Sequence, residues 1–155
     1  MGDDRLPGET NELIRILNKD LFLYLLDLEV KRARRYQNFL SLLMLNLKQL
    51  SEDDGKYSQV CQQALGRLLS AELRETDLLG SLGENSLVVL LPYADPSAGG
   101  IARSRFEDIL KYYDFRNKGY EVLVDQRCFP KNGTDVIDLI GEALKRERLE
   151  SSGGE

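Results

Sequence analysis

The sequence predicts an α+β fold, an α/β sandwich in which helices pack on the faces of a mainly antiparallel sheet. Two observations favour this class. Apolar runs short enough to be buried strands alternate with longer segments of helical periodicity. Two of these runs flank a polar turn at 83–86, and strands joined by such a glycine-containing link form an antiparallel hairpin.

The first half of the chain predicts two helices and one buried strand. Thr10 or Asn11 is a suitable N-cap for a long helix that runs to about Tyr36. Three further elements follow: a buried strand at 39–47, a loop at 51–55 and a helix at about 57–73.

The second half predicts the hairpin, two more helices and a last strand. Asp95 and Pro96 are a good cap and first-turn pair for a helix that ends near Tyr113. Thr134 is the expected cap of a last helix that ends near Leu149. The remaining elements are hairpin strands near 77–82 and 87–91, a strand at 120–126 and a turn at 130–133. This order contains βαββαβ, the ferredoxin-like arrangement.

Length and charge bound the function. At 155 residues, the chain is expected to form a single domain over 10–150, with a flexible N-terminus at 1–9 and a flexible tail at 151–155. The formal net charge of −5 argues against general binding to nucleic-acid phosphates. No apolar run is long enough to cross a bilayer and no signal peptide is visible, so we expect no membrane insertion and a cytoplasmic location.

Cysteine and histidine, the commonest zinc ligands, are scarce or absent. Cys61 and Cys128 do not have the spacing of a metal site, and the chain has no histidine. We therefore expect two reduced thiols, no metal site and no cofactor.

One motif surrounds the hairpin. Arg74 and Asp77 form Arg-x-x-Asp, and after five residues come Gly83, Glu84, Asn85, Ser86 and Leu87. This arrangement resembles the signature of the GGDEF family, the diguanylate cyclases, which read Arg-x-x-Asp, five residues and then Gly-Gly-Asp-Glu-Phe. The five hairpin residues therefore look like a degenerate form of that signature.

Other segments extend the resemblance. Asn18 and Phe22 match positions in the family's opening Asn-Arg-Arg-x-Phe pattern, and 129–134 is similar to its Tyr-Pro-x-Asp-Gly turn. The similarity covers about 11–148, and the shared order and spacing make it specific.

The resemblance also implies that the cyclase chemistry is lost. The family joins two GTP molecules with divalent metal, which needs hard oxygen ligands. Asn46 and Lys48 stand at the family's Asp-x-Asp pair, Asn85 stands at its signature aspartate and Ser86 at its signature glutamate. We expect no catalytic residue, although one alternative is that Glu84 supplies a carboxylate from one position earlier.

The Arg-x-x-Asp motif is retained, and in the family this inhibitory motif binds cyclic di-GMP. Arginine pairs with guanine O6 and N7, and aspartate accepts from guanine N1–H and N2–H. The family often adds an arginine about thirty residues later, which is Arg105 here, with Arg103 as the alternative. The sequence therefore predicts a cyclic di-GMP receptor that uses Arg74, Asp77 and Arg105. The alternative without a ligand is that Arg74 and Asp77 form a surface ion pair.

The first predicted helix carries a second apolar row. Its members are Leu17, Leu21, Tyr24 and Leu28. The row predicts a surface for a protein partner or for self-association, or else a wider buried face of the same helix. A ligand-free interaction or dimerisation module is thus the alternative function, ahead of residual GTP binding or cyclase activity.

Overall fold

The computed structural model of the chain describes residues 15–50 and 55–153, with side chains as far as residue 145. The expected flexible segment 1–9 and most of the predicted loop 51–55 lie outside the described residues. The elements are β1 (Ile16–Leu17), α2 (Lys19–Tyr36), β2 (Leu40–Gln49), α3 (Ser58–Glu72), β3 (Leu78–Gly83), β4 (Ser86–Pro92), α4 (Pro96–Ile109), β5 (Tyr120–Phe129) and α5 (Val136–Gly153), with short 3₁₀ turns at Leu110–Tyr112 and Arg116–Lys118.

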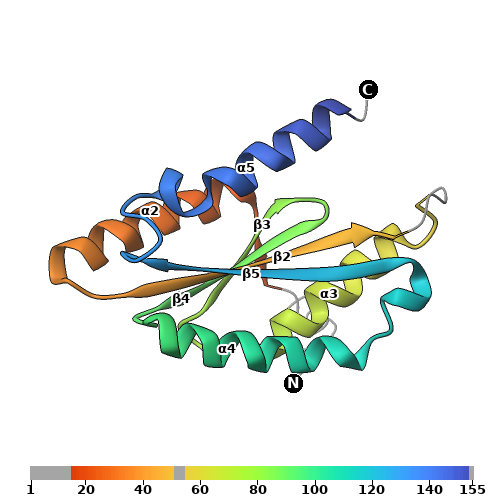
Figure 1. Cartoon of the computed structure of the whole chain (residues 1–155), viewed down its shortest axis with the longest axis horizontal. Helices are drawn as coiled ribbons and strands as arrows, with labels where there is room; N and C mark the ends of the chain where they lie inside the picture. The colour runs from red at the N-terminus through yellow and green to blue at the C-terminus, as the bar shows by residue number, and fades with distance from the viewer. Residues whose placement is uncertain (1–14, 51–54, 154–155) are drawn as a thin grey trace, which may run out of the picture.

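The strands form one five-stranded sheet in the order β1-β3-β4-β2-β5. Every neighbouring pair is antiparallel except β1 with β3. Helices α2 and α5 cover one face and α3 and α4 the other (Figure 1). The four longer strands and the helices α3 and α4 confirm the predicted ferredoxin-like core.

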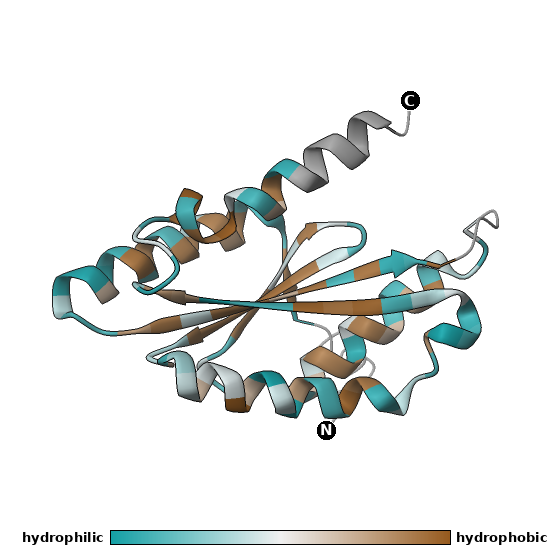
Figure 2. Ribbon diagram, in the orientation of Figure 1, coloured by the Kyte–Doolittle hydropathy of each residue, from teal (hydrophilic) through white to brown (hydrophobic). Residues whose placement is uncertain are grey.

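The central strand β2 is buried on both faces, because side chains alternate across a strand. Leu42 and Met44 pack on the side of α2 and α5, whereas Leu43 and Leu45 pack on the side of α3 and α4. Figure 2 shows the apolar residues concentrated along the strands at the centre of the sheet. The apolar run ends at Leu47, so the end of β2 presents polar side chains.

The first helix is shorter than predicted. It begins at Lys19, and Asn18 is its N-cap, with Oδ1 accepting a hydrogen bond of 2.8 Å from the backbone N–H of Leu21. The prediction of a helix through 15–18 is therefore wrong. Ile16 and Leu17 instead pair with β3 as a short parallel edge strand. Their apolar side chains fit either element, so hydrophobicity alone did not separate them.

The last helix begins one residue later than predicted. Asp135 rather than Thr134 caps α5, because its Oδ1 accepts from the backbone N–H of Asp138 at 2.8 Å. Asp138 in turn accepts from the N–H and the hydroxyl of Thr134 at 3.1 and 3.2 Å, which ties the residue before the cap to the first turn of the helix. The helix also extends past the expected end, to Gly153.

Both cysteines are buried and unpaired. Burial raises the pKa of the Cys61 and Cys128 thiols, which keeps them protonated and poorly nucleophilic. Within the described part of the chain, no helix has the length and apolar character to cross a membrane.

Close packing of α2 on β3 requires a glycine at position 80. A Cβ there would lie 2.4 Å from the ring of Phe22, which is fully buried. We expect Gly80→Ala to lower the free energy of unfolding by about 1–3 kcal/mol because the buried ring has little room to move. Urea denaturation measures the change.

Gly100→Ala on α4 is the matched control. Beyond its chain neighbours and the backbone of its own helix, no atom lies within 4 Å of the added Cβ, and we expect this variant to be about 0.5–1 kcal/mol more stable. Equal stability of the two variants would contradict the packing argument.

Candidate functional site

The hairpin positions Asn85 beside the end of β2. Strand β3 ends at Gly83 and β4 begins at Ser86, so Glu84 and Asn85 form the turn itself. The backbone N–H of Leu47 donates to the carbonyl of Asn85 at 2.8 Å. Ser86 and Leu87 are buried, so the last two signature positions contribute to the fold rather than to an open surface.

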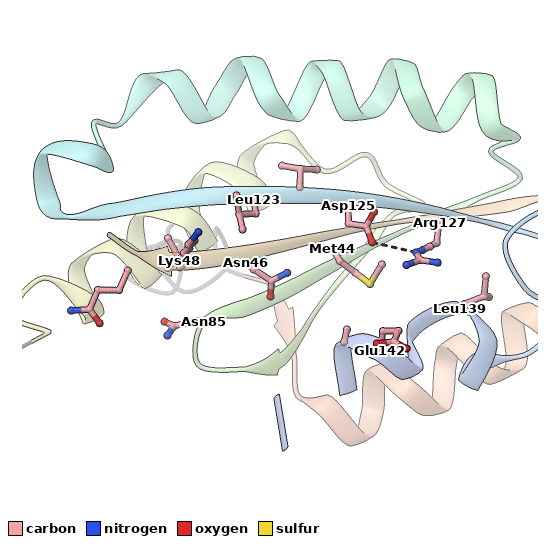
Figure 3. Close-up of a pocket in the computed structure, with 13 residues that line it drawn as sticks. Met44, Asn46, Lys48, Asn85, Leu123, Asp125, Arg127, Leu139 and Glu142 are labelled. Carbon is pink, nitrogen blue, oxygen red and sulfur yellow. Dashed lines mark hydrogen bonds and ion pairs between the residues drawn. The ribbon is translucent and has the colours of Figure 1, made fainter. Parts of the chain in front are cut away.

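A pocket of about 660 Å³ lies next to this turn. Asn46, Lys48 and Asn85 line it together, as Figure 3 shows, so the three positions expected to replace the metal ligands meet in one place. The other side consists of β5 and α5, which contribute Leu123, Val124, Asp125, Arg127, Leu139, Glu142 and Ala143. Glu84 is exposed and does not line the pocket, so its position does not support its role as a substitute ligand.

The pocket does not fit the magnesium ion that the resemblance implies. The Oδ1 of Asn85 already accepts a hydrogen bond of 3.0 Å from Nε2 of Gln62. Lys48 brings a positive charge, which repels a dication. Asp125 pairs with Arg127 at 3.2 Å. No group of three or more acidic, cysteine or histidine side chains in the described segments is arranged to hold a metal ion.

A second candidate site lies between α3 and α4, around Asp77. The Asp77 carboxylate is buried, and its Oδ2 accepts from the backbone N–H of Arg74 at 2.9 Å. The N–H of Asp77 donates to the carbonyl of Arg74 at 3.0 Å. These two bonds fix the turn between α3 and β3 and leave the Arg74 side chain exposed.

Arg105 reaches this turn from α4, where α3 and α4 lie on the same face of the sheet (Figure 1). Its Nη2 lies 4.0 Å from Oδ2 of Asp77, and its Nε lies 2.9 Å from Oε2 of Glu72. Arg103 instead donates to the carbonyl of Val124 at 2.8 Å, on the side of β5. Of the two sequence candidates, Arg105 is therefore the one beside Asp77.

The Arg105 guanidinium has unused donors. Its Nε and Nη2 atoms are shielded from solvent and, among the described residues, have no hydrogen-bond partner. The 2.9 Å approach to Glu72 is therefore an ion pair without the alignment of a hydrogen bond. Buried donors without an acceptor are unfavourable, so an acceptor atom of a ligand is well suited to this position.

Sequence reasoning missed several residues of both sites. Glu72 is the main one, although a carboxylate on the last residue of a helix is unfavourable next to the helix dipole and could have drawn attention to it. Gln62, Asp125, Arg127 and Glu142 come from other elements, and only the packing of those elements places them at the pocket.

The predicted apolar row on α2 is exposed in part. The exposed fractions are 43% for Leu21, 62% for Tyr24 and 45% for Leu28. Leu17 does not belong to this row, because it lies in β1 and packs against the core. Phe22 and Leu26 form the buried face of the same helix.

Comparison with known proteins adds the relationships of the chain. The family profile described as "Diguanylate cyclase, GGDEF domain" matches residues 10–146. A DGC protein from Thermotoga maritima has a similar structure, with a TM-score of 0.71 and 18% identity over 88% of this chain and 98% of that chain. No curated protein gives a significant sequence match.

Two further solved structures are similar. One is a microbial GGDEF domain described for a novel interaction mode with bis-(3,5)-cyclic di-GMP, with a TM-score of 0.64 and 17% identity over 89% of this chain and 91% of that chain. The other is the diguanylate cyclase SiaD in complex with its activator SiaC from Pseudomonas aeruginosa, with a TM-score of 0.65 and 19% identity over 92% of this chain and 57% of that chain.

Proposed function

The chain belongs to the GGDEF family of diguanylate cyclase domains, and from this premise we propose that it binds cyclic di-GMP without synthesising it. The proposal depends chiefly on one observation: Arg105 of α4 lies beside Asp77 in the turn that Arg74 begins, and the Arg105 donors lack an acceptor. The role is that of a receptor, which responds to the messenger through its occupancy.

The chemistry of the cluster suits a guanine base. The Arg74 side chain is exposed and can pair with O6 and N7 or stack on the ring. The buried carboxylate of Asp77 is fixed by its bond to the Arg74 backbone, so its free lone pairs can accept from guanine N1–H and N2–H. Cyclic di-GMP also carries two phosphodiesters, which favour nearby arginines.

The lack of catalysis follows from the pocket at the hairpin. Phosphoryl transfer between nucleotides depends on metal ions that neutralise the developing charge. Asn46, Lys48 and Asn85 offer two neutral amides and a cation where the family places carboxylates. A similar microbial GGDEF domain is described for its interaction with cyclic di-GMP, which is consistent with a binding role for this fold.

Calorimetric titration with cyclic di-GMP tests the receptor proposal. We expect saturable binding to the wild type, and we expect Arg74→Ala to weaken it by about fivefold or more, because a bidentate arginine–guanine contact contributes about 1–3 kcal/mol. Arg67→Ala is the matched control, since Arg67 is an exposed arginine on α3 before the turn. Equal affinities of the two variants would place the ligand elsewhere.

Incubation with GTP and Mg²⁺ tests the loss of catalysis. We expect no cyclic product above a protein-free control, because Asn46, Lys48 and Asn85 stand at the positions where the family places its metal ligands. Chromatography of the nucleotides provides the measurement, with an active diguanylate cyclase as the positive control. Appreciable cyclic di-GMP formation would refute the inactive assignment.

A second candidate function is self-association through α2. The exposed side chains of Leu21, Tyr24 and Leu28 favour it, because they follow one face of the helix at a spacing of three and four residues. In this reading a second copy of the chain covers the row, and the domain acts through assembly.

Gel filtration of Leu21→Glu tests this second function. We expect a wild-type dimer to shift to the elution volume of a monomer, because a buried unpaired carboxylate is strongly unfavourable at an apolar contact. Ile101→Glu is the control, since Ile101 is an exposed apolar residue on α4. A wild type that elutes as a monomer at all concentrations would rule out self-association.

A further inference from the structure

Glu72 occupies the Arg105 side of the candidate binding site. It is the last residue of α3, and its Oε2 lies 2.9 Å from Nε of Arg105. The two side chains are 28% and 23% exposed, so the pair is only partly screened by water. The same guanidinium lies 4.0 Å from Asp77. One arginine thus faces two carboxylates, only one of which belongs to the Arg-x-x-Asp motif.

The position of Glu72 on its helix explains why it holds Arg105. A negative charge at a helix C-terminus is unfavourable because the helix dipole is negative there. The last turn of α3 has no basic residue of its own. Arg105 of α4 therefore supplies the compensating positive charge. The ion pair therefore links α3 to α4. A ligand of the candidate binding site would have to bind the same guanidinium.

We propose that Glu72 is a built-in competitor that limits the affinity of this site for guanine-containing ligands. The inference rests on the proposed function, because the site that Glu72 restrains is the one assigned to cyclic di-GMP. The Glu72 carboxylate lies 2.9 Å from Nε of Arg105, the distance at which an acceptor of the ligand would contact the same atom. Because the Arg105 donors are not aligned on Glu72, the competition is for the charge and position of the guanidinium, and binding then requires that Arg105 move from Glu72 toward the base.

Charge adds to this competition. Arg74 and Arg105 contribute two positive charges near the turn, while Glu72, Glu75 and Asp77 contribute three negative ones. The ligand brings two further negative charges on its phosphodiesters. Removing the charge of Glu72 therefore both releases Arg105 and reduces repulsion. Glu75 is exposed and carries the same charge three residues away, so it separates the general electrostatic effect from the competition for Arg105.

Titration of the folded chain with cyclic di-GMP, comparing wild type, Glu72→Gln and Glu75→Gln, tests the inference. We expect Glu72→Gln to bind about fivefold tighter than wild type, because a partly exposed ion pair contributes up to about that factor. We expect a smaller gain for Glu75→Gln. Cyclic di-AMP is the ligand control, since adenine presents an amino group where guanine presents O6, and we expect no gain with it.

Two further variants keep the test decisive. Arg105→Ala combined with Glu72→Gln should lose the gain, because the released guanidinium is then absent. Glu72→Asp keeps the charge but shortens the side chain, and an intermediate affinity is expected from it. Circular dichroism establishes that each variant is folded.

The possible outcomes distinguish the inference from the proposed function. If wild type binds cyclic di-GMP and Glu72→Gln binds no more tightly than Glu75→Gln, Glu72 is not a competitor, while the receptor function stands. If Glu72→Gln binds cyclic di-GMP and wild type does not, the competition is strong enough to prevent binding, and the inference is supported. If wild type and Glu72→Gln both fail to bind, the receptor function itself is wrong, and the inference is wrong with it.

Discussion

Both candidate sites depend on strand β2 being buried on its two faces. It pairs with β4 on one side and β5 on the other, and its leucines divide between the two cores. This arrangement fixes the sheet register, so that Asn46 lies opposite Ser86 in the hairpin and Leu123 in β5. It also provides the surface on which α3 and α4 pack side by side, which is the condition for Arg105 to approach Asp77.

The two sites differ in what their charges can do. In the hairpin pocket, Asn46, Lys48 and Asn85 offer two amides and a cation instead of anions, so these positions do not attract a dication and Lys48 repels it. The cluster between α3 and α4 has the reverse character. Its arginine donors are present in excess of aligned acceptors, although two glutamates nearby reduce the attraction for an anionic ligand. The proposed loss of synthesis and the proposed binding of cyclic di-GMP therefore depend on different sets of residues.

Much of this fold follows from the sequence, because its signals are local. The apolar run of β2, the hairpin turn and the Asp95–Pro96 cap each depend on neighbouring residues, and the structure confirms them. The short strand β1 was not predicted, since Ile16 and Leu17 are apolar in either element and its formation depends on the distant β3. Asp135 and Thr134 are both good caps, so only the backbone geometry separates them.

The sequence predicts which residue types form the two sites, but it does not predict which side chains contact one another there. Ala102 and Phe106 bury the face of α4 that lies on the sheet, so Arg103 and Arg105 leave the helix on opposite sides of that face. The sequence left these two arginines as alternatives because the rotation of the helix depends on packing. The sequence alone does not show that Glu72 contacts Arg105, because this contact depends on the packing of α3 beside α4. The hydrogen bond that the Asn85 oxygen accepts likewise comes from Gln62 of α3, which only the packing of α3 brings to the hairpin.

We propose that this domain binds cyclic di-GMP between α3 and α4 and not at the hairpin. Backbone amide chemical shifts of the isotope-labelled chain, recorded while cyclic di-GMP is added, test it most directly. We predict that the largest changes occur at 72–77 and around Arg105, with little change at Asn46 and Asn85. Changes confined to Asn46, Asn85 and their neighbours, with none at Arg74 or Arg105, would contradict it.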